Sequence, residues 1–199
     1  MSDLFISGSG SNRALQRTRR AALLRFHGFS SRRVAELGSL GRCTHTTMTT
    51  ENKIEKLRAI DELHVQDEGA NRWSIFCDVP MSEFDWMALL EGLDLRSLSL
   101  KTTHLTERVA ITYIPKIRSI QSLNLSTNLD LDGVFLMSLP DTYPTEVIDV
   151  TRTSMRDLAL EQFVRLKNIK CVFANKTQFS DKAMAAIPVT RELEVRFFD

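Results

Sequence analysis

Oxygen-bearing side chains alternate with apolar ones in the segment Asn128-x-Asp130-x-Asp132-Gly133, a spacing that matches the first half of a calcium-binding loop. Such a loop needs a glutamate at its twelfth position to hold the ion through two oxygens. That position is Leu139 in this chain, and leucine is a residue type typical of a helix interior. The sequence therefore favours an ordinary helix start at this segment over a metal site.

Cysteine and histidine side chains are the other candidates for chemistry. Cys43 and His45 carry ligand atoms suited to zinc, but no second pair follows at the spacing of a zinc site. Cys77 and His104 could act as nucleophile and base, yet no residue pattern indicates a group that orients them or an oxyanion hole. We therefore expect a non-enzymatic protein with no catalytic residue, no cofactor-binding residue and no metal ligand.

The charge of the chain is unevenly distributed. Residues 1–45 contain eight arginines and two acidic residues, whereas residues 46–199 contain 18 basic and 23 acidic side chains and so carry a net charge of −5. A mildly acidic surface is unsuited to nucleic acid, which requires clustered positive charge. Three scattered cysteines indicate a reducing compartment, and no apolar run has the roughly 20 residues that span a bilayer.

Residues 1–47 differ in composition from the rest of the chain and are predicted to be a basic, disordered leader. Their richness in arginine and serine is typical of an organelle transit peptide. The alternative, which we favour, is a misassigned start, because Met48 opens a plausible protein in which Thr50 could cap a helix. Residues 48–69 are then expected to form an N-terminal capping helix, with the helix itself running from Glu51 to about Leu63.

A phrase of about 25 residues recurs through the rest of the chain. Apolar pairs stand at steps of 25, 25 and 24 residues, at Leu98/Leu100, Leu123/Leu125, Ile148/Val150 and Val172/Ala174. A polar residue follows each pair three positions later, namely Thr103, Asn128, Thr153 and Thr177. Trp73 and Ile75 lie 25 residues before Leu98 and Leu100, so they are expected to share the register. Periods of this length predict strand-and-helix units that bury one apolar face against their neighbours.

Each unit is predicted to contain a strand, a turn and a short helix, and the helix starts are expected at Thr106, Asp132, Arg156–Asp157 and Ser180. The combined pattern resembles the leucine-rich repeat family, in its short β–α form, over residues 70–199, with about five repeats. The resemblance implies an α/β solenoid, a short horseshoe with a parallel sheet on its concave face and helices on its convex face. It also implies that Thr103, Asn128, Thr153 and Thr177 turn inward and bond to the backbone as a structural ladder.

The side chains between the inward apolar residues are expected to form the concave strand face. Exposed aromatic and arginine side chains anchor many protein interfaces. The residues predicted to bind a partner on this face are Lys101, Asn124, Asp149, Phe173, Arg196 and Phe198.

Together these features predict a protein–protein interaction module of the adaptor type, with an unidentified protein partner and neither nucleic acid nor membrane as a ligand. The alternative is a structural or assembly factor that pairs through an open C-terminal strand edge. A monomer is favoured over an edge-paired dimer. The expected location is the cytoplasm, or an organelle matrix if residues 1–47 are a transit peptide.

Overall fold

A computed structural model describes residues 48–187 and 193–198 of the chain. The basic leader expected over residues 1–47 lies outside this part. The described residues form one seven-stranded sheet whose strands follow each other in sequence order. Every neighbouring pair from β2 to β7 is parallel, and β1 alone pairs antiparallel to its neighbour. The α/β class with a parallel sheet is thus confirmed.

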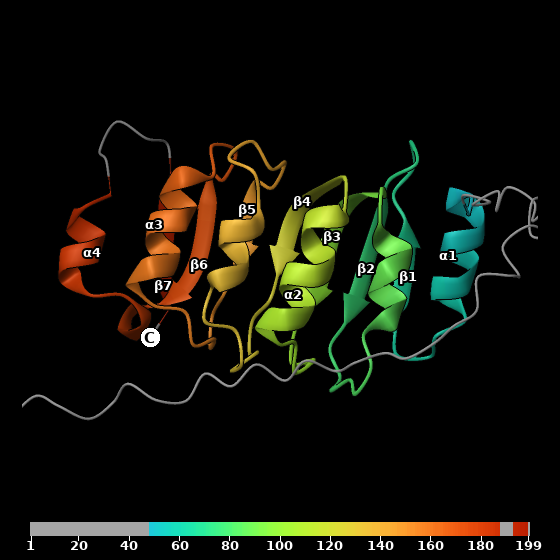
Figure 1. Cartoon of the computed structure of the whole chain (residues 1–199), viewed down its shortest axis with the longest axis horizontal. Coiled ribbons are helices and arrows are strands. Elements are labelled where there is room, and N and C mark those ends of the chain that lie inside the picture. The colour runs from blue at the N-terminus through green and yellow to red at the C-terminus, as the bar shows by residue number, and fades with distance from the viewer. Residues whose placement is uncertain (1–47, 188–192, 199) are drawn as a thin grey trace, which may run out of the picture. The chain divides into compact units, whose positions relative to one another are not determined.

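The strands are short and regularly placed along the chain (Figure 1). Their bounds are β1 His64–Asp67, β2 Trp73–Cys77, β3 Asp94–Leu100, β4 Ser119–Asn124, β5 Val147–Asp149, β6 Cys171–Asn175 and β7 Glu194–Phe198. The α-helices are α1 Thr50–Arg58, α2 Glu107–Tyr113, α3 Asp157–Arg165 and α4 Asp181–Ala185, and the 3-10 helices are η1 Asp85–Leu90, η2 Ile114–Lys116, η3 Val134–Ser138 and η4 Lys176–Gln178.

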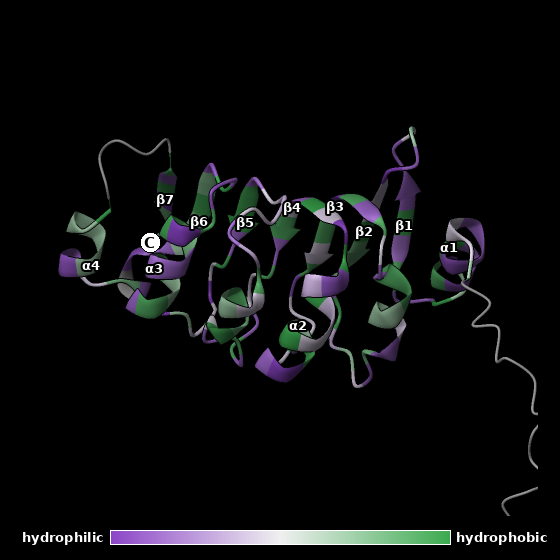
Figure 2. Ribbon diagram, turned by 45° about the horizontal axis from the view of Figure 1, so that its top comes forward, coloured by the Kyte–Doolittle hydropathy of each residue, from purple (hydrophilic) through white to green (hydrophobic). Residues whose placement is uncertain are grey.

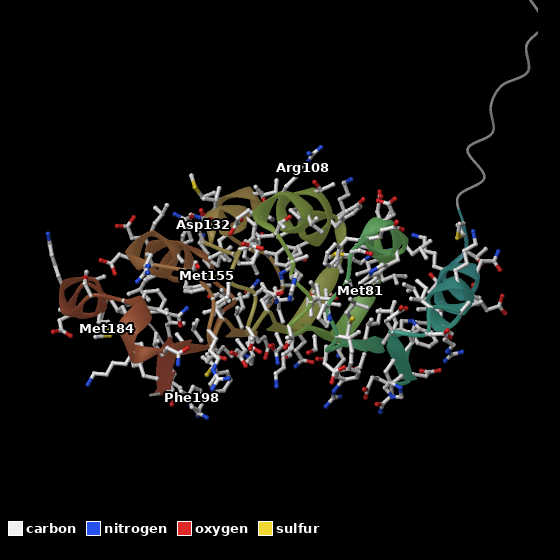
Figure 3. All side chains as sticks on the ribbon, turned by 90° about the horizontal axis from the view of Figure 1, so that it is seen from below. Met81, Arg108, Asp132, Met155, Met184 and Phe198 are labelled. Carbon is white, nitrogen blue, oxygen red and sulfur yellow. The ribbon has the colours of Figure 1, made fainter. Side chains whose placement is uncertain are left out.

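The helices and the strands form two layers. Figure 3 shows the helical segments on one side and the strands on the other, with Arg108 and Asp132 on the helical side and Phe198 on the strand side. We call the sheet face turned away from the helices the open face. Among the described residues, no helix combines the length and the apolar character needed to cross a membrane.

The core lies between the two layers and follows the predicted period. The eight residues of the four recurring apolar pairs, from Leu98 to Ala174, are all fully buried. The register aligns Leu98 with Leu123, Leu123 with Ile148, and Ile148 with Val172, as predicted. Each of these side chains contributes about 1.5–3 kcal/mol by leaving water, so the core rather than any polar contact holds the layers together.

The 25-residue step fails for β2. The structure pairs Ile75 with Leu98 and Cys77 with Leu100, an offset of 23 residues, so Trp73 and Ile75 are not the equivalents of Leu98 and Leu100. The connection from β2 to β3 contains only η1 and is shorter than the later ones, and the register also shifts between Trp73 and Ser74. Counting by a fixed period overlooks both effects.

The N-terminal helix is shorter than expected. α1 begins after Thr49, whose side chain accepts the Asn52 amide at 3.3 Å, and it ends at Arg58. The predicted extension to Leu63 is wrong, because turns follow and the chain then enters β1. Ile54 and Leu57 are nevertheless buried, so α1 closes the core beside β1 as a capping element would.

Of the four expected helix starts, two have the side-chain hydrogen bond that starts a helix and two lack it. Ser180 caps α4, because its hydroxyl accepts the Ala183 amide at 3.2 Å, and Asp132 accepts the Val134 amide at 3.1 Å at the start of η3. Thr106 precedes α2 and Arg156 precedes α3, but neither side chain makes a capping hydrogen bond. The positions of the helices are therefore better predicted than the chemistry that starts them.

Polar side chains also link consecutive units of the sheet. Arg118 pairs with Asp94 at 3.1 Å across 24 residues, and the Ser119 hydroxyl donates to the same carboxylate at 2.8 Å. The Asn168 amide donates to the Tyr143 carbonyl, 25 residues earlier, at 3.1 Å. Adjacent strands are thus linked by side chains as well as by the sheet.

Candidate functional site

One row of side chains crosses the entire open face. The strand register places in this row the successive neighbours His64, Phe76, Ser99, Asn124, Asp149, Phe173 and Arg196. None of them is buried, whereas the residues before and after them in β3–β6 belong to the core. At about 4.8 Å between strands, six steps span roughly 29 Å. The row is therefore long enough to contact a macromolecule.

Three of the predicted partner-binding residues meet at the C-terminal end of this row, and we call Phe173, Arg196 and Phe198 the aromatic cluster. The rings of Phe173 and Phe198 lie 5.8 Å apart, and the Arg196 guanidinium lies 5.7 Å from the Phe173 ring. Phe198 is 50% exposed. A ring pair that is half-buried at Phe173 and exposed at Phe198, with a cation over one ring, offers apolar area and hydrogen-bond donors together, which is typical of interface anchors.

A carboxylate next to the aromatic cluster balances the positive charge of Arg196. Glu194 pairs with Arg196 on the same strand, with Oε1 and Nε 2.8 Å apart. The hydrogen bond from Arg196 lowers the pKa of Glu194, and the carboxylate in turn raises the pKa of Arg196. Both groups are charged at neutral pH, so a partner meets a balanced ion pair at this end of the face.

Asn124 and Asp149, two other predicted partner-binding residues, are engaged with their own backbone. The Asn124 side-chain oxygen accepts the Ser126 amide at 2.9 Å, and Asp149 accepts the Thr151 amide at 2.9 Å. Each bond joins a residue to the amide two positions later and so fixes the turn at the end of its strand. The structure therefore gives these residues a local structural role that the sequence analysis did not foresee.

Lys101 lies in the turn after β3, beside a hollow of about 660 Å³ at the β1 end of the face. Its lining includes three carboxylates together with the row members His64, Phe76 and Ser99. The rings of His64 and Phe76 lie 6.1 Å apart. The open face thus has aromatic side chains at both ends and small polar side chains between them.

Three residues of the predicted ladder, Thr103, Asn128 and Thr153, lie inside the molecule at the strand ends. The Thr103 hydroxyl donates to the Leu100 carbonyl at 3.0 Å, and that of Thr153 donates to the Val150 carbonyl at 2.7 Å. The Asn128 amide nitrogen donates to the carbonyls of Leu100 at 2.6 Å and Leu125 at 2.9 Å, and its oxygen accepts the Leu105 amide at 2.9 Å.

The fourth ladder residue was expected to be Thr177. The side chain of Thr177 is outside the part that the structure describes, and the neighbouring Gln178 makes the buried contacts at this level. Its amide donates to the Val150 carbonyl at 3.0 Å and to the Thr153 hydroxyl at 3.0 Å. Gln178 lies 25 residues after Thr153, so counting one full period from the preceding ladder residue finds it. Counting three positions from Ala174 leads to Thr177 instead.

The candidate catalytic and metal-binding residues are dispersed or engaged in structure. Cys77 is buried, its thiol donates to the Val79 carbonyl at 3.7 Å, and burial raises the pKa of this thiol. The side chain of Asn128 is committed to backbone groups and so does not ligate a cation. Within residues 48–187 and 193–198, no group of three or more His, Cys, Asp or Glu side chains could hold a metal ion. Cys43 and His45 lie outside this part.

Phe76 and His64 are the surface residues that the sequence analysis missed. Phe76 could have been found, because it stands between the apolar residues Ile75 and Cys77 and so must face the opposite side. His64 could not have been found, because β1 has a polar sequence without alternation.

Comparisons with protein-family models, with curated proteins and with solved structures found no match to this chain.

Proposed function

We propose that this chain is a leucine-rich-repeat solenoid that binds a protein partner on its open face and performs no catalysis. The solenoid is supported by the strands from β3 to β6, which recur at steps of 24 or 25 residues with their buried residues in register. It is supported further by inward polar residues at positions 103, 128, 153 and 178, each of which bonds to the backbone at a strand end.

The observation that carries the binding function is the aromatic cluster. Its two phenylalanines contact each other on the open face instead of entering the core, and apolar area gathered on a surface is typical of an interaction site. Arg196 and Glu194 form an ion pair beside these rings, so the cluster adds polar groups of both charges to its apolar area. The partner surface that fits is an apolar side chain flanked by polar groups.

The length of the row favours a protein or peptide over a small molecule. A small ligand is usually held in a concave apolar pocket, whereas the hollow near β1 is lined mainly by charged and polar side chains. Binding across the roughly 29 Å row would bring both aromatic ends into contact with one partner. The cytoplasm is the proposed compartment, and an organelle matrix follows if residues 1–47 act as a transit peptide.

The test compares two variants in affinity capture from cells that express the chain naturally. Phe173→Ala combined with Phe198→Ala removes the rings of the cluster, while Met137→Ala combined with Leu158→Ala removes exposed apolar side chains on the helical side. A partner of the open face should be retained by the wild type and the control variant and be reduced at least about tenfold by the first variant. Binding of the purified partner should show the same order of affinities.

A set of captured proteins that is identical for all three chains would contradict the assignment of this face. Loss of a protein only with the helical-side variant would move the interface to the other layer. Circular dichroism must show the same thermal unfolding for both variants within a few degrees, so that loss of capture cannot be ascribed to unfolding.

A second candidate function is supported by the edge of the sheet. β7 is the last strand in the order and pairs on one side only within the described residues. An unpaired strand edge is a template for another strand. The chain would then act as an assembly factor, joined to another subunit through β7.

A further inference from the structure

No strand of the described residues pairs with the outer edge of β7. Four of its five residues are exposed, whereas every internal strand from β3 to β6 contains fully buried residues. Phe197 aligns with the buried Ala174 but is itself 38% exposed, although its ring packs edge-on against Phe179 at 6.4 Å. The core therefore continues to the last strand and is incompletely covered there.

The backbone direction of β7 fixes which groups point outward. The Glu194 amide donates to the Lys170 carbonyl at 2.8 Å, so the backbone groups of Glu194 face β6. Backbone groups alternate in direction along a strand, and those of Val195 and Phe197 therefore point to the outer edge. An added antiparallel strand must pair with these two residues.

The side-chain pattern of β7 is self-complementary about Val195. If Val195 pairs with Val195 of a second, antiparallel copy, Glu194 of each copy lies opposite Arg196 of the other, on the open face. On the core side, Leu193 lies opposite Phe197. Sliding the pairing by two residues would instead place Arg196 opposite Arg196, and directly opposed like charges are destabilising.

We propose that two copies of this chain associate through β7, antiparallel and centred on Val195, so that their two sheets become one. The contact is isologous, because each copy contributes the same residues, and it therefore closes as a dimer. The salt bridge between Glu194 and Arg196 within one strand becomes a group of four alternating charges. Phe197, Val195 and Leu193 of the two copies continue the apolar layer across the junction.

This inference rests on the second candidate function and identifies its partner as the chain itself. The two proposals share Arg196 but are tested with different substitutions, because the open-face partner is tested with Phe173 and Phe198 and the junction with Glu194 and Arg196. Failure of self-association would leave the binding of that partner untouched, and failure of partner capture would leave the dimer untouched.

The experiment uses charge reversal in the full chain. Light scattering after size exclusion should give the wild type twice the mass of one 22.7 kDa chain at sufficient concentration. In the Glu194→Arg variant an arginine faces an arginine at two places across the junction, and in the Arg196→Glu variant a glutamate faces a glutamate at the same two places. Each single variant should associate at least about tenfold more weakly than the wild type. A mixture of the two variants should recover a dimer, because every opposed pair then has opposite charges.

Three results would each overturn the β7 junction. The first is a wild type that remains a single chain at every concentration. The second is a dimer that survives Glu194→Arg, because the contact would then use another surface or the register that places Arg196 opposite itself. The third is a pair of single variants that lose the dimer and fail to recover it when mixed, which would show that the charges act within one strand.

Discussion

The side-chain amide of Asn128 donates a hydrogen bond to the carbonyl of Leu100, 28 residues earlier in the chain and at the end of the neighbouring strand. The same amide nitrogen donates to the carbonyl of Leu125 in its own unit, and the side-chain oxygen accepts a hydrogen bond from the backbone amide of Leu105. One fully buried side chain therefore ties two consecutive units together at the point where each leaves the sheet.

Replacing Asn128 with alanine should lower the free energy of unfolding by about 3 kcal/mol or more, because three buried backbone groups lose a partner. Asn168→Ala is the matched control. Its amide also donates to two carbonyls, those of Thr142 and Tyr143, but Asn168 is exposed, and its loss should cost less than about 1 kcal/mol. Urea denaturation of both variants measures the difference. Equal losses would show that burial of Asn128 is not what makes it important.

Replacing Thr127 with asparagine should stabilise the chain. Thr127 has a φ of 62°, and Thr102 and Arg152, each 25 residues away, share this left-handed conformation. A β-branched residue is disfavoured there, whereas asparagine tolerates it, so we expect a gain of about 0.5–1 kcal/mol. Thr142→Asn is the control, because Thr142 also lies in a turn, is exposed where Thr127 is half-buried, and has no positive φ. A gain at Thr142 that matches the gain at Thr127 would argue against backbone strain.

Replacing Arg165 with alanine should destabilise the contact between α3 and the end of η3. Its guanidinium donates to the carbonyls of Leu136 at 2.7 Å and Leu139 at 3.0 Å, at the end of η3, and also contacts the carboxylate of Asp141. Loss of these charged hydrogen bonds should cost about 2 kcal/mol. Arg165→Lys should recover little, because one ammonium cannot match the planar fork.

The control for Arg165 is Arg118→Ala, which removes an exposed ion pair with Asp94 and should cost less than about 1 kcal/mol. Thermal unfolding of the three variants ranks them. Full recovery by Arg165→Lys would show that charge alone, and not the geometry of the guanidinium, stabilises the end of η3.

Alkaline pH should destabilise the chain through Tyr143. Its hydroxyl donates to the Ile114 carbonyl at 2.8 Å inside the core, and burial raises its pKa well above the ordinary value of about 10. The unfolded chain ionises this phenol above about pH 10 while the folded chain does not, so this contribution to stability is complete below pH 10 and is lost as pH rises.

Absorbance titration checks this, since the chain has two tyrosines. The phenol of Tyr143 should ionise only when the chain unfolds. Tyr143→Phe should lose about 1 kcal/mol at neutral pH but show a weaker decline above pH 10. Ionisation of Tyr143 while the chain is still folded would contradict the burial of its side chain.

The period of the sequence was sufficient to predict the sheet from β3 to β6, because buried leucine, isoleucine and valine side chains can recur in phase only if their strands stack in order. It was insufficient at both ends. β1 has the polar sequence HVQD, and its extended form depends on pairing with β2 instead of on its own residues. The register of β2 depends on the length of η1, which a repeat count cannot supply.

The candidate site was predictable to a similar degree. Alternation along each strand is enough to assign Phe173 and Arg196 to one face, and the parallel register then makes them direct neighbours. The turn-forming roles of Asn124 and Asp149 depend on bonds over two residues, which composition does not reveal. Gln178 was missed because the count started from the strand and not from the preceding ladder residue.

The reversed direction of β1 has a consequence for how such chains can aggregate. If both ends of the sheet were parallel and apolar, the end of one molecule could add to the start of the next without limit and produce a fibre. β1 instead presents a hydrophilic tetrapeptide running the opposite way, beside α1 (Figure 2). A short polar edge of this kind is a poor template for head-to-tail growth. The β7 junction proposed above is isologous, and addition through it would stop after one step.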